Sequence, residues 1–399
     1  MAFATLFILA ACAPRNPVNA PANVTPEAWD TAFAIAGASF RNDTGIARSV
    51  VSKGNNYRLC KFIEKANGAG TVRIGFIGGS ITGGAMASDA QHDFASLFCG
   101  HVAKLFPRTT VVQINAGVGG TNSRFGCSRV HDDLLAHDPD LVVVEFAVND
   151  DPSDTFTTMA AMEGIVRQCL QAPDVPVIML FLMNRSGDTV DQDLHSRVGM
   201  QYGLPLISYR NECWPLVAAG IIPLDSLFAD AIHPNNRGHQ LLAFLLFSFL
   251  VNTMRGNTPD NPIPVAQPLI TDLYQYASIQ RVDDTCVSTA ADAGWTPIVK
   301  EYSRTGYWTV HAGDSMCLST SVRELTVGYQ LSLHTSSRVQ ITLDGATADT
   351  ISSFFLNGWE GGMMELNRIY LQDQAGPHTV RFKSLDNDTF CIDYVLYAP

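Results

Sequence analysis

Three side chains of this sequence, Ser80, Asp230 and His233, are of the types that nucleophilic catalysis uses, and the aspartate and histidine lie three residues apart. Ser80 lies in the glycine-rich stretch Gly78–Gly84, directly after the apolar run Val72–Ile77. A serine hydroxyl is a poor nucleophile until a base removes its proton, and a histidine can do this near neutral pH. Asp230 precedes His233 on one short stretch, close enough to fix the tautomer of the ring. The pattern predicts Ser80 as nucleophile, His233 as base and Asp230 as its partner.

Taken alone, the stretch around Ser80 has to be compared with several known types of glycine-rich loop. A phosphate-binding loop needs Gly-x-x-x-x-Gly-Lys-Ser/Thr, and no lysine follows here. A dinucleotide-binding fingerprint needs Gly-x-Gly-x-x-Gly, and the spacing fails from either Gly75 or Gly78. A nucleophile elbow of the Gly-x-Ser-x-Gly type has a glycine where Thr82 stands. A nucleophilic serine in a Gly-x-Ser-x-Thr turn and a plain turn both remain open.

Acyl transfer also needs donors for the negative charge that develops on the carbonyl oxygen. The candidates for this oxyanion hole are the backbone amides of Ser80 and Gly120 and the side-chain amide of Asn149. Gly117 competes with Gly120 for the amide role. An alternative interpretation is that Asn149 caps a strand. The acidic stretch Asp150–Asp154 is expected to form a solvated loop.

Apolar runs that alternate with helical patterns are expected to position these residues on a parallel sheet with helices on both faces. The expected strands are Val72–Ile77, Thr110–Asn115, Leu141–Val148, Val177–Met183 and Leu204–Ser208. The expected helices are Phe94–Leu105, Met159–Leu170 and Arg237–Met254. Ligands bind such sheets at the carboxyl ends of the strands, where Ser80, Gly120 and Asn149 are expected.

The pattern changes after the last expected helix. Gly256–Pro268 is rich in proline, glycine and asparagine and is typical of a linker. Beyond it, Val339, Ile341 and Leu343 alternate with polar residues, and Thr379–Lys383 and Phe390–Tyr397 look similar. This period predicts an antiparallel β-sandwich.

The N-terminal stretch has features of an export leader. Ala2–Ala11 is apolar, and a stretch rich in proline, asparagine and alanine continues to Pro26. The residues up to Cys12 resemble a bacterial lipobox, in which the cysteine is lipidated, although no basic residue precedes Arg15. We therefore expect a secreted protein or a cell-surface lipoprotein, with a lipidated Cys12 as its membrane attachment. The expected organisation is a leader and tether over 1–26, a catalytic domain with an N-terminal helical extension over 27–255, a linker over 256–268 and a β-sandwich over 269–399.

Composition excludes several classes of function. Apolar residues make up 46% of the chain and charged residues 16%, which is enough to build packed cores. A net charge of −12 argues against binding to a nucleic-acid backbone, which needs a basic face. The chain has no Cys-x-x-Cys and no cysteine–histidine pair at zinc spacing. We expect neither a metal nor a cofactor.

Four stretches resemble, in order, the four signature blocks of the SGNH (GDSL-type) hydrolase superfamily, over about Thr71–Met254. Ser80 matches the nucleophile of the first block, Gly120 the glycine of the second and Asn149 the asparagine of the third. Asp230 and His233 match the Asp-x-x-His of the last block. The sequence departs from the pattern where Gly79 replaces the aspartate of the eponymous motif and Ala147 replaces a glycine. The resemblance implies a three-layer, flavodoxin-like α/β hydrolase domain.

The C-terminal part of the sequence gives weaker evidence, and it concerns the substrate. Its closing stretches, "GPHTVRF" and "CIDYVLY", resemble those of carbohydrate-binding β-sandwich modules. Trp308 and Trp359 are candidates for stacking on a sugar ring, with Trp359 favoured because glycines flank its loop. Some SGNH esterases that deacetylate polysaccharides carry such a domain, so the resemblance implies removal of O-acetyl groups from carbohydrate. The alternatives are a lipase or lysophospholipase, and a catalytically silent carbohydrate-binding surface protein.

Overall fold

The computed structural model describes residues 43–172, 174–184, 186–187, 191–256, 259–290, 294–356 and 363–399. The chain forms two compact units that divide after Asp272. The first unit is an α/β structure and the second consists almost entirely of β-strands.

A six-stranded sheet forms the centre of the first unit, in the order β1-β6-β5-β4-β2-β3. Its strands are β1 (Val50–Ser52), β2 (Thr71–Gly78), β3 (Thr110–Gly117), β4 (Leu141–Glu145), β5 (Val177–Phe181) and β6 (Leu206–Ser208). Strands β2 to β6 are parallel, whereas the short edge strand β1 runs antiparallel to β6. All residues of β4 and β5 are buried, as expected for strands that are covered on both faces.

The strand order places a topological switch point between β2 and β4. The chain proceeds from β2 outward to β3 and then returns past β2 to β4, β5 and β6. Doubly wound sheets of this flavodoxin-like order bind their ligands at the switch point, beyond the carboxyl ends of the strands. The expected fold of the α/β unit is confirmed, and its site is expected at the ends of β2 and β4.

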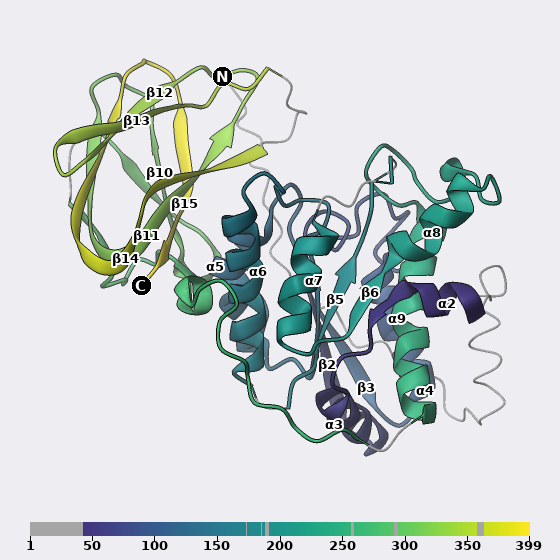
Figure 1. The fold of residues 1–399 in the computed structure, drawn as a ribbon. Helices are drawn as coiled ribbons and strands as arrows, with labels where there is room; N and C mark the ends of the chain where they lie inside the picture. The colour runs from purple at the N-terminus through teal and green to yellow at the C-terminus, as the bar shows by residue number, and fades with distance from the viewer. Residues whose placement is uncertain are drawn as a thin grey trace. The chain divides into compact units, whose positions relative to one another are not determined.

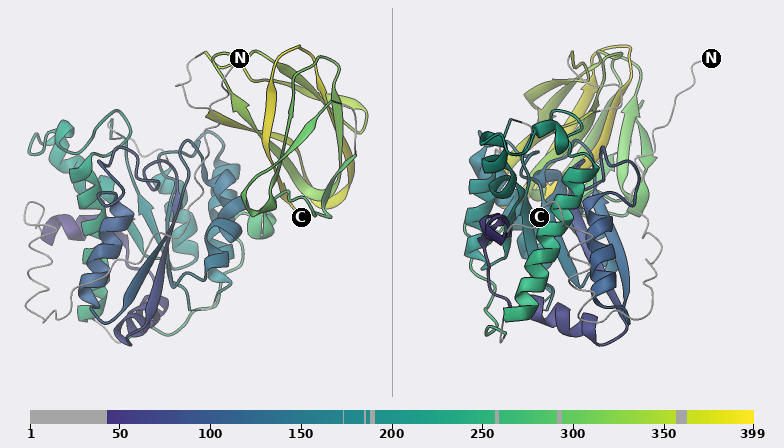
Figure 2. Two further views of the ribbon diagram at one scale, coloured as in Figure 1. Left: turned by 180° about the vertical axis from the view of Figure 1, so that it is seen from behind. Right: turned by 90° about the vertical axis from the view of Figure 1, so that its right-hand side faces the viewer.

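Helices cover both faces of the sheet, with α4 and α9 on one face and α5, α6 and α7 on the other (Figures 1 and 2). The α-helices are α2 (Asp43–Ser49), α3 (Tyr57–Asn67), α4 (Phe94–Leu105), α5 (Ser123–Asp133), α6 (Thr155–Leu170), α7 (Gln192–Gln201), α8 (Tyr209–Ala218) and α9 (Asn236–Gly256). The apolar stretch Leu241–Val251 of α9 lies in the core, packed with α4. Among the described helices, none combines the length and hydropathy that crossing a membrane requires.

Two expected boundaries are wrong by more than two residues, and local hydrogen bonds explain both. The strand expected to reach Val148 ends at Glu145, because the carbonyl of Phe146 accepts bonds from the amides of Asn149 and Asp150 and turns the chain. Helix α6 begins at Thr155 rather than Met159, because the side chain of Asp154 caps the amide of Thr157.

The segment expected to be a linker lies along the first unit where the structure describes it. The backbone amide of Asp260 and the side-chain oxygen of Asn56 form a hydrogen bond of 2.6 Å, and the amide of Asn56 donates back to the Asp260 carboxylate at 2.8 Å. Further along, Arg167 donates to the carbonyl of Ala266 at 3.0 Å. These bonds fix the path of the segment instead of leaving it free.

The second unit is the expected antiparallel β-sandwich. Its described residues form nine strands: β7 (Ser278–Ile279), β8 (Val287–Ala290), β9 (Thr296–Val299), β10 (Thr305–Thr309), β11 (Ser315–Leu331), β12 (Arg338–Leu343), β13 (Ala346–Ser352), β14 (Met363–Ser384) and β15 (Phe390–Ala398). Val339 and Ile341 are buried in its core, as the alternation predicted. Trp308 on β10 points outward with 37% of its surface exposed, because its neighbours Tyr307 and Thr309 face inward.

Glu163 on α6 fixes the end of the segment before the second unit. Its carboxylate accepts hydrogen bonds from the amides of Leu269, Ile270 and Thr271 and from the hydroxyl of Tyr202, at 2.5–3.0 Å. Glu163 itself is fully buried. Its loss would therefore leave several donors without an acceptor.

We expect Glu163→Ala to lower the free energy of unfolding by roughly 3 kcal/mol, because each unsatisfied donor costs about 1–3 kcal/mol when buried. Chemical denaturation measures this change. Glu163→Gln keeps one acceptor oxygen and should cost less. The exposed Glu64→Ala serves as the control, with an expected change within about 0.5 kcal/mol. Equal stabilities of the Glu163→Ala and Glu64→Ala proteins would contradict the assignment.

Candidate active site

Ser80 lies in a tight turn at the carboxyl end of β2. Hydrogen bonds from the amide of Gly83 to the carbonyl of Gly79, at 3.0 Å, and from the amide of Ala85 to the carbonyl of Ser80, also at 3.0 Å, close this turn. The side-chain amide of Asn115, on the adjacent strand β3, donates to the carbonyl of Thr82 at 2.8 Å. The turn is therefore held from within and from β3, and Ser80 remains partly exposed at its tip.

His233 and Asp230 lie on the loop that precedes α9. The Nδ1 atom of His233 is 2.8 Å from Oδ2 of Asp230, whose other oxygen accepts the backbone amides of Ile232 and His233 at 2.7 Å each. The amide of Ala229 donates to the carbonyl of His233 at 2.9 Å and closes the loop. Although desolvation opposes it, these hydrogen bonds lower the pKa of Asp230. The carboxylate is ionised at neutral pH and can only accept.

The loop brings the histidine to the serine. The Nε2 atom of His233 lies 2.9 Å from Oγ of Ser80. Because the ionised Asp230 accepts from Nδ1, the proton of the neutral imidazole is assigned to Nδ1, and the Nε2 lone pair faces the serine hydroxyl. The structure thus brings together the three residues predicted for catalysis, in the arrangement that lets a base activate a serine.

The side chain of Asn149 lies against Gly79, next to Ser80. A Cβ atom on Gly79 would come within 2.5 Å of the Asn149 side-chain oxygen. In this structure the amide of Asn149 therefore occupies the space that a side chain at position 79 would need. The predicted oxyanion donor Asn149 is therefore adjacent to the nucleophile turn.

The glycines that follow β3 have distinct surroundings. The amide of Gly117 donates to the side-chain oxygen of Asn115 at 2.9 Å, so it is not free to bind an oxyanion. A Cβ on Gly119 would lie 3.7 Å from Cβ of Ser80, which places this loop beside the nucleophile. Gly120 has a φ of +70°. Of the two glycines considered for the amide role, only Gly120 remains available, and its function as an oxyanion donor stays a prediction.

Asp150 is buried, which corrects the expectation of a solvated acidic loop at this position. One of its oxygens accepts the amide of Ser123 at 2.7 Å, and the other lies 2.8 Å from Nε2 of His195 on α7. The side chains of Asp150 and His195 are 2% and 1% exposed. Asp150 thus connects the loop of Asn149 to the start of α5, directly after the Gly120 loop. No motif in the sequence marked His195.

His239 on α9 has a structural role. Its Nδ1 accepts the amide of Phe94 at 3.2 Å, and its Nε2 donates to the carbonyl of Ala85 at 3.0 Å. Burial lowers its pKa and favours the neutral ring that this pattern requires. His239 therefore joins α9 and α4 to the end of the nucleophile turn.

Two predicted residues, Trp359 and Cys12, lie outside the described residues. No group of three histidine, cysteine, aspartate or glutamate side chains that could hold a metal ion occurs in the described part of the chain.

Glu145, the last residue of β4, lies fully buried beneath the turns that carry Ser80 and Asn149. Its carboxyl group accepts the amide of Ala147 at 3.1 Å and lies 3.4 Å from the hydroxyl of Thr82. Burial, and to a smaller extent the charge of Asp150, raises the pKa of Glu145 to about 8 despite these bonds. The group is therefore mostly a neutral acid at neutral pH.

We expect Glu145→Gln to remove a pH dependence of stability. A carboxyl whose pKa is raised on folding stabilises the protein fully below its ordinary value of 4.5, and this stability is lost as the pH rises through about 8. Glutamine mimics the neutral acid at every pH. The difference in unfolding free energy, variant minus wild type, should therefore increase between pH 5 and pH 9 in urea denaturation. Parallel pH curves for the two proteins would show that Glu145 is not neutral in the folded state.

Comparisons with known proteins agree with this geometry. Residues 76–241 match the model of the GDSL-like Lipase/Acylhydrolase family. A crystal structure of a two-domain esterase (CEX) active on acetylated mannans is similar over 88% of this chain and 98% of that chain, with 27% identity and a TM-score of 0.82. The structure of a two-domain esterase (CEX) co-crystallized with mannopentaose is similar over 88% of this chain and 97% of that chain, with 27% identity and a TM-score of 0.79. A comparison with curated proteins gave no match.

The matched segment contains every residue predicted for catalysis, and the similarity to the solved structures extends over both units. The resemblance expected from the four sequence blocks is therefore confirmed. Residues 76–241 of the α/β unit form a GDSL-like lipase/acylhydrolase domain, and the protein is a carboxylic ester hydrolase.

Proposed function

We propose that this esterase removes O-acetyl groups from carbohydrate through an acyl-enzyme formed on Ser80. The observation that carries the proposal is the continuous chain of short contacts from Asp230 through His233 to Oγ of Ser80. The similarity to an esterase that is active on acetylated mannans supports the substrate class.

The geometry assigns a role to each group. His233 Nε2 takes the proton of Ser80 as Oγ attacks the ester carbonyl, and Asp230 stabilises the imidazolium that forms. The same proton then passes to the departing alcohol oxygen, which leaves an acyl group on Ser80. A water molecule gives a proton to His233 and attacks this acyl group. His233 then returns that proton to Oγ of Ser80 as the acyl–oxygen bond breaks, and the carboxylic acid leaves. The amides of Ser80 and Gly120 and the side chain of Asn149 bind the oxyanion in both steps.

An acetyl group offers little surface for recognition. Each buried methylene contributes only about 0.8 kcal/mol, so an acetyl-specific enzyme must gain its binding energy from the alcohol side of the ester. A carbohydrate supplies hydroxyl groups and an apolar ring face for this purpose. For an acetyl ester, this reasoning favours a carbohydrate over a small alcohol as the alcohol part of the substrate.

We expect Asn149→Ala to lower kcat by roughly 10²–10³-fold with a much smaller change in KM, because an oxyanion donor acts mainly in the transition state. Steady-state hydrolysis of p-nitrophenyl acetate measures both constants. Asn122→Ala, which removes a helix cap but no proposed oxyanion donor, is the control. If only KM changed, Asn149 would bind the substrate instead.

The substrate class is tested with acetylated polysaccharides and with p-nitrophenyl esters of increasing chain length. The proposal predicts that acetate is released from acetylated mannan or xylan and that acetyl esters react faster than long-chain esters. A preference for long acyl chains, with no acetate released from glycans, would favour a lipase or lysophospholipase. A folded protein that hydrolyses no ester would point to a silent carbohydrate-binding protein.

A further inference from the structure

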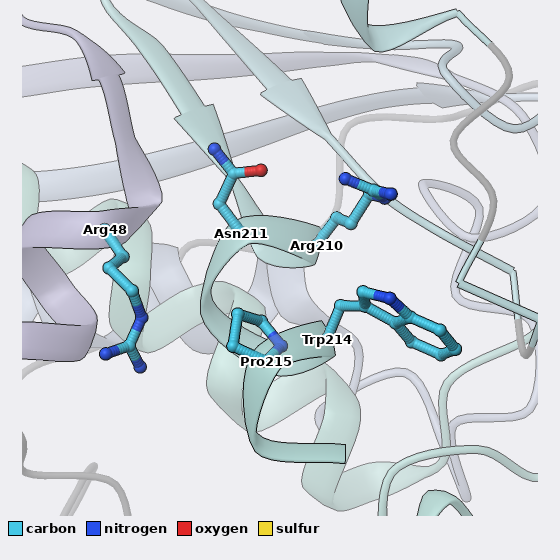
Figure 3. A pocket seen from close by; sticks show the side chains of 5 residues that line it. All are labelled: Arg48, Arg210, Asn211, Trp214 and Pro215. Carbon is cyan, nitrogen blue, oxygen red and sulfur yellow. The ribbon is translucent and has the colours of Figure 1, made fainter. Parts of the chain in front are cut away.

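A hollow separate from the catalytic residues lies between α2 and the first turns of α8. Its volume is about 260 Å³, and it is lined by Arg48, Arg210, Asn211, Trp214 and Pro215. Arg48 enters from α2, and the other side chains come from α8 (Figure 3). None of the residues predicted for catalysis lines this hollow.

Neighbouring groups hold the side chains of the hollow in place. The Nε of Arg210 donates to the carbonyl of Gly187 at 2.7 Å, which restrains the guanidinium. Gly187 also packs against the indole of Trp214, since a Cβ there would lie 2.4 Å from the ring. On the opposite side, Arg48 is held by Glu212 at 3.0 Å. The binding surface is therefore largely pre-formed.

The lining residues offer hydrogen-bond donors and an aromatic ring. The side-chain oxygen of Asn211 already accepts from Gln192 at 3.3 Å, so its NH₂ group remains as the donor. The guanidinium groups of Arg48 and Arg210 can only donate. A ligand that has acceptor oxygens and a small apolar face fits these groups, and a sugar ring has both.

The hollow is lined by side chains of α8, a helix that begins at the same edge of the sheet as the catalytic serine. Arg210 follows the carboxyl end of β6, and Ser80 follows the carboxyl end of the parallel strand β2. Two strands, β5 and β4, lie between them. Three strand spacings of about 4.8 Å separate the two ends by roughly 14 Å, which is the length of a short oligosaccharide.

We propose that the hollow at Arg210 and Trp214 is a remote subsite that binds a sugar unit of the polysaccharide whose acetyl group lies at Ser80. The proposal rests on carbohydrate being the substrate. It implies that long substrates bind through two separated contacts, whereas short substrates reach only the catalytic site.

The test compares Arg210→Ala and Trp214→Ala with the wild type on an acetylated mannobiose, on an acetylated mannohexaose and on p-nitrophenyl acetate. Loss of one charged donor or of the ring should raise KM for the hexaose about tenfold, because a hydrogen bond to a charged group contributes roughly 1.4 kcal/mol or more. The constants for the two short substrates should stay within about twofold, since neither residue touches the reacting atoms. Arg108→Ala removes an exposed guanidinium before β3, at the opposite edge of the sheet, and is the matched control.

Binding without turnover separates this subsite from the proposed function. Unacetylated mannohexaose is titrated calorimetrically into the Ser80→Ala protein with and without Arg210→Ala or Trp214→Ala. A loss of affinity of about tenfold in the double variants supports the subsite even if no acetylated glycan is hydrolysed, which would contradict only the proposed function. Folded variants whose KM and affinity for the hexaose match those of the Arg108→Ala control would overturn the subsite.

Discussion

The hydrogen bond between Ser80 and His233 joins two loops that are 153 residues apart in the sequence. Neither loop has the size to hold its shape alone, so the geometry depends on the sheet and on α9. Strand β2 fixes the turn of Ser80, while the start of α9 and the backbone bond from Ala229 fix the loop of His233. His239 then connects α9 to the turn of Ser80 and to α4, because it forms hydrogen bonds with the carbonyl of Ala85 and with the amide that begins α4. The parallel sheet serves as the frame on which separate short loops meet at one edge.

Close backbone packing around the site leaves little room for side chains. A Cβ on Gly78 would lie 2.2 Å from the hydroxyl of Thr82, and a Cβ on Gly117 would lie 2.2 Å from the amide of Gly83. Glycine at these positions lets the turn of Ser80 sit directly on the ends of β3 and β4. The buried carboxyl groups under this contact form hydrogen bonds. Glu145 bonds to Ala147 and Thr82, and Asp150 bonds to Ser123 and His195. These pairs support the two turns from below without occupying the space above Ser80.

Much of this arrangement could be predicted from the sequence, since it depends on local patterns. The apolar runs gave the parallel strands, and the order of the four blocks brought Ser80, Asn149, Asp230 and His233 to one edge. The partner of Asp150 could not be predicted, because His195 lies on a helix whose sequence has no distinctive pattern. The fold alone brings His195 within hydrogen-bonding distance of Asp150. The same holds for Glu163, whose partners are backbone amides more than 100 residues away. The end of β4 was misjudged because Phe146–Val148 are as apolar as the strand itself, and only the bonds to the Phe146 carbonyl turn the chain.

The central claim is that His233 activates Ser80 as the nucleophile. Labelling with a serine-directed fluorophosphonate, followed by peptide mass spectrometry, tests it most directly, because the reagent reacts with activated serines rather than with all exposed ones. The account predicts a single adduct on Ser80, formed rapidly in the wild type and at least about 10³-fold more slowly in a folded His233→Ala variant. An adduct on a different serine, or labelling of Ser80 at the same rate without His233, would contradict it.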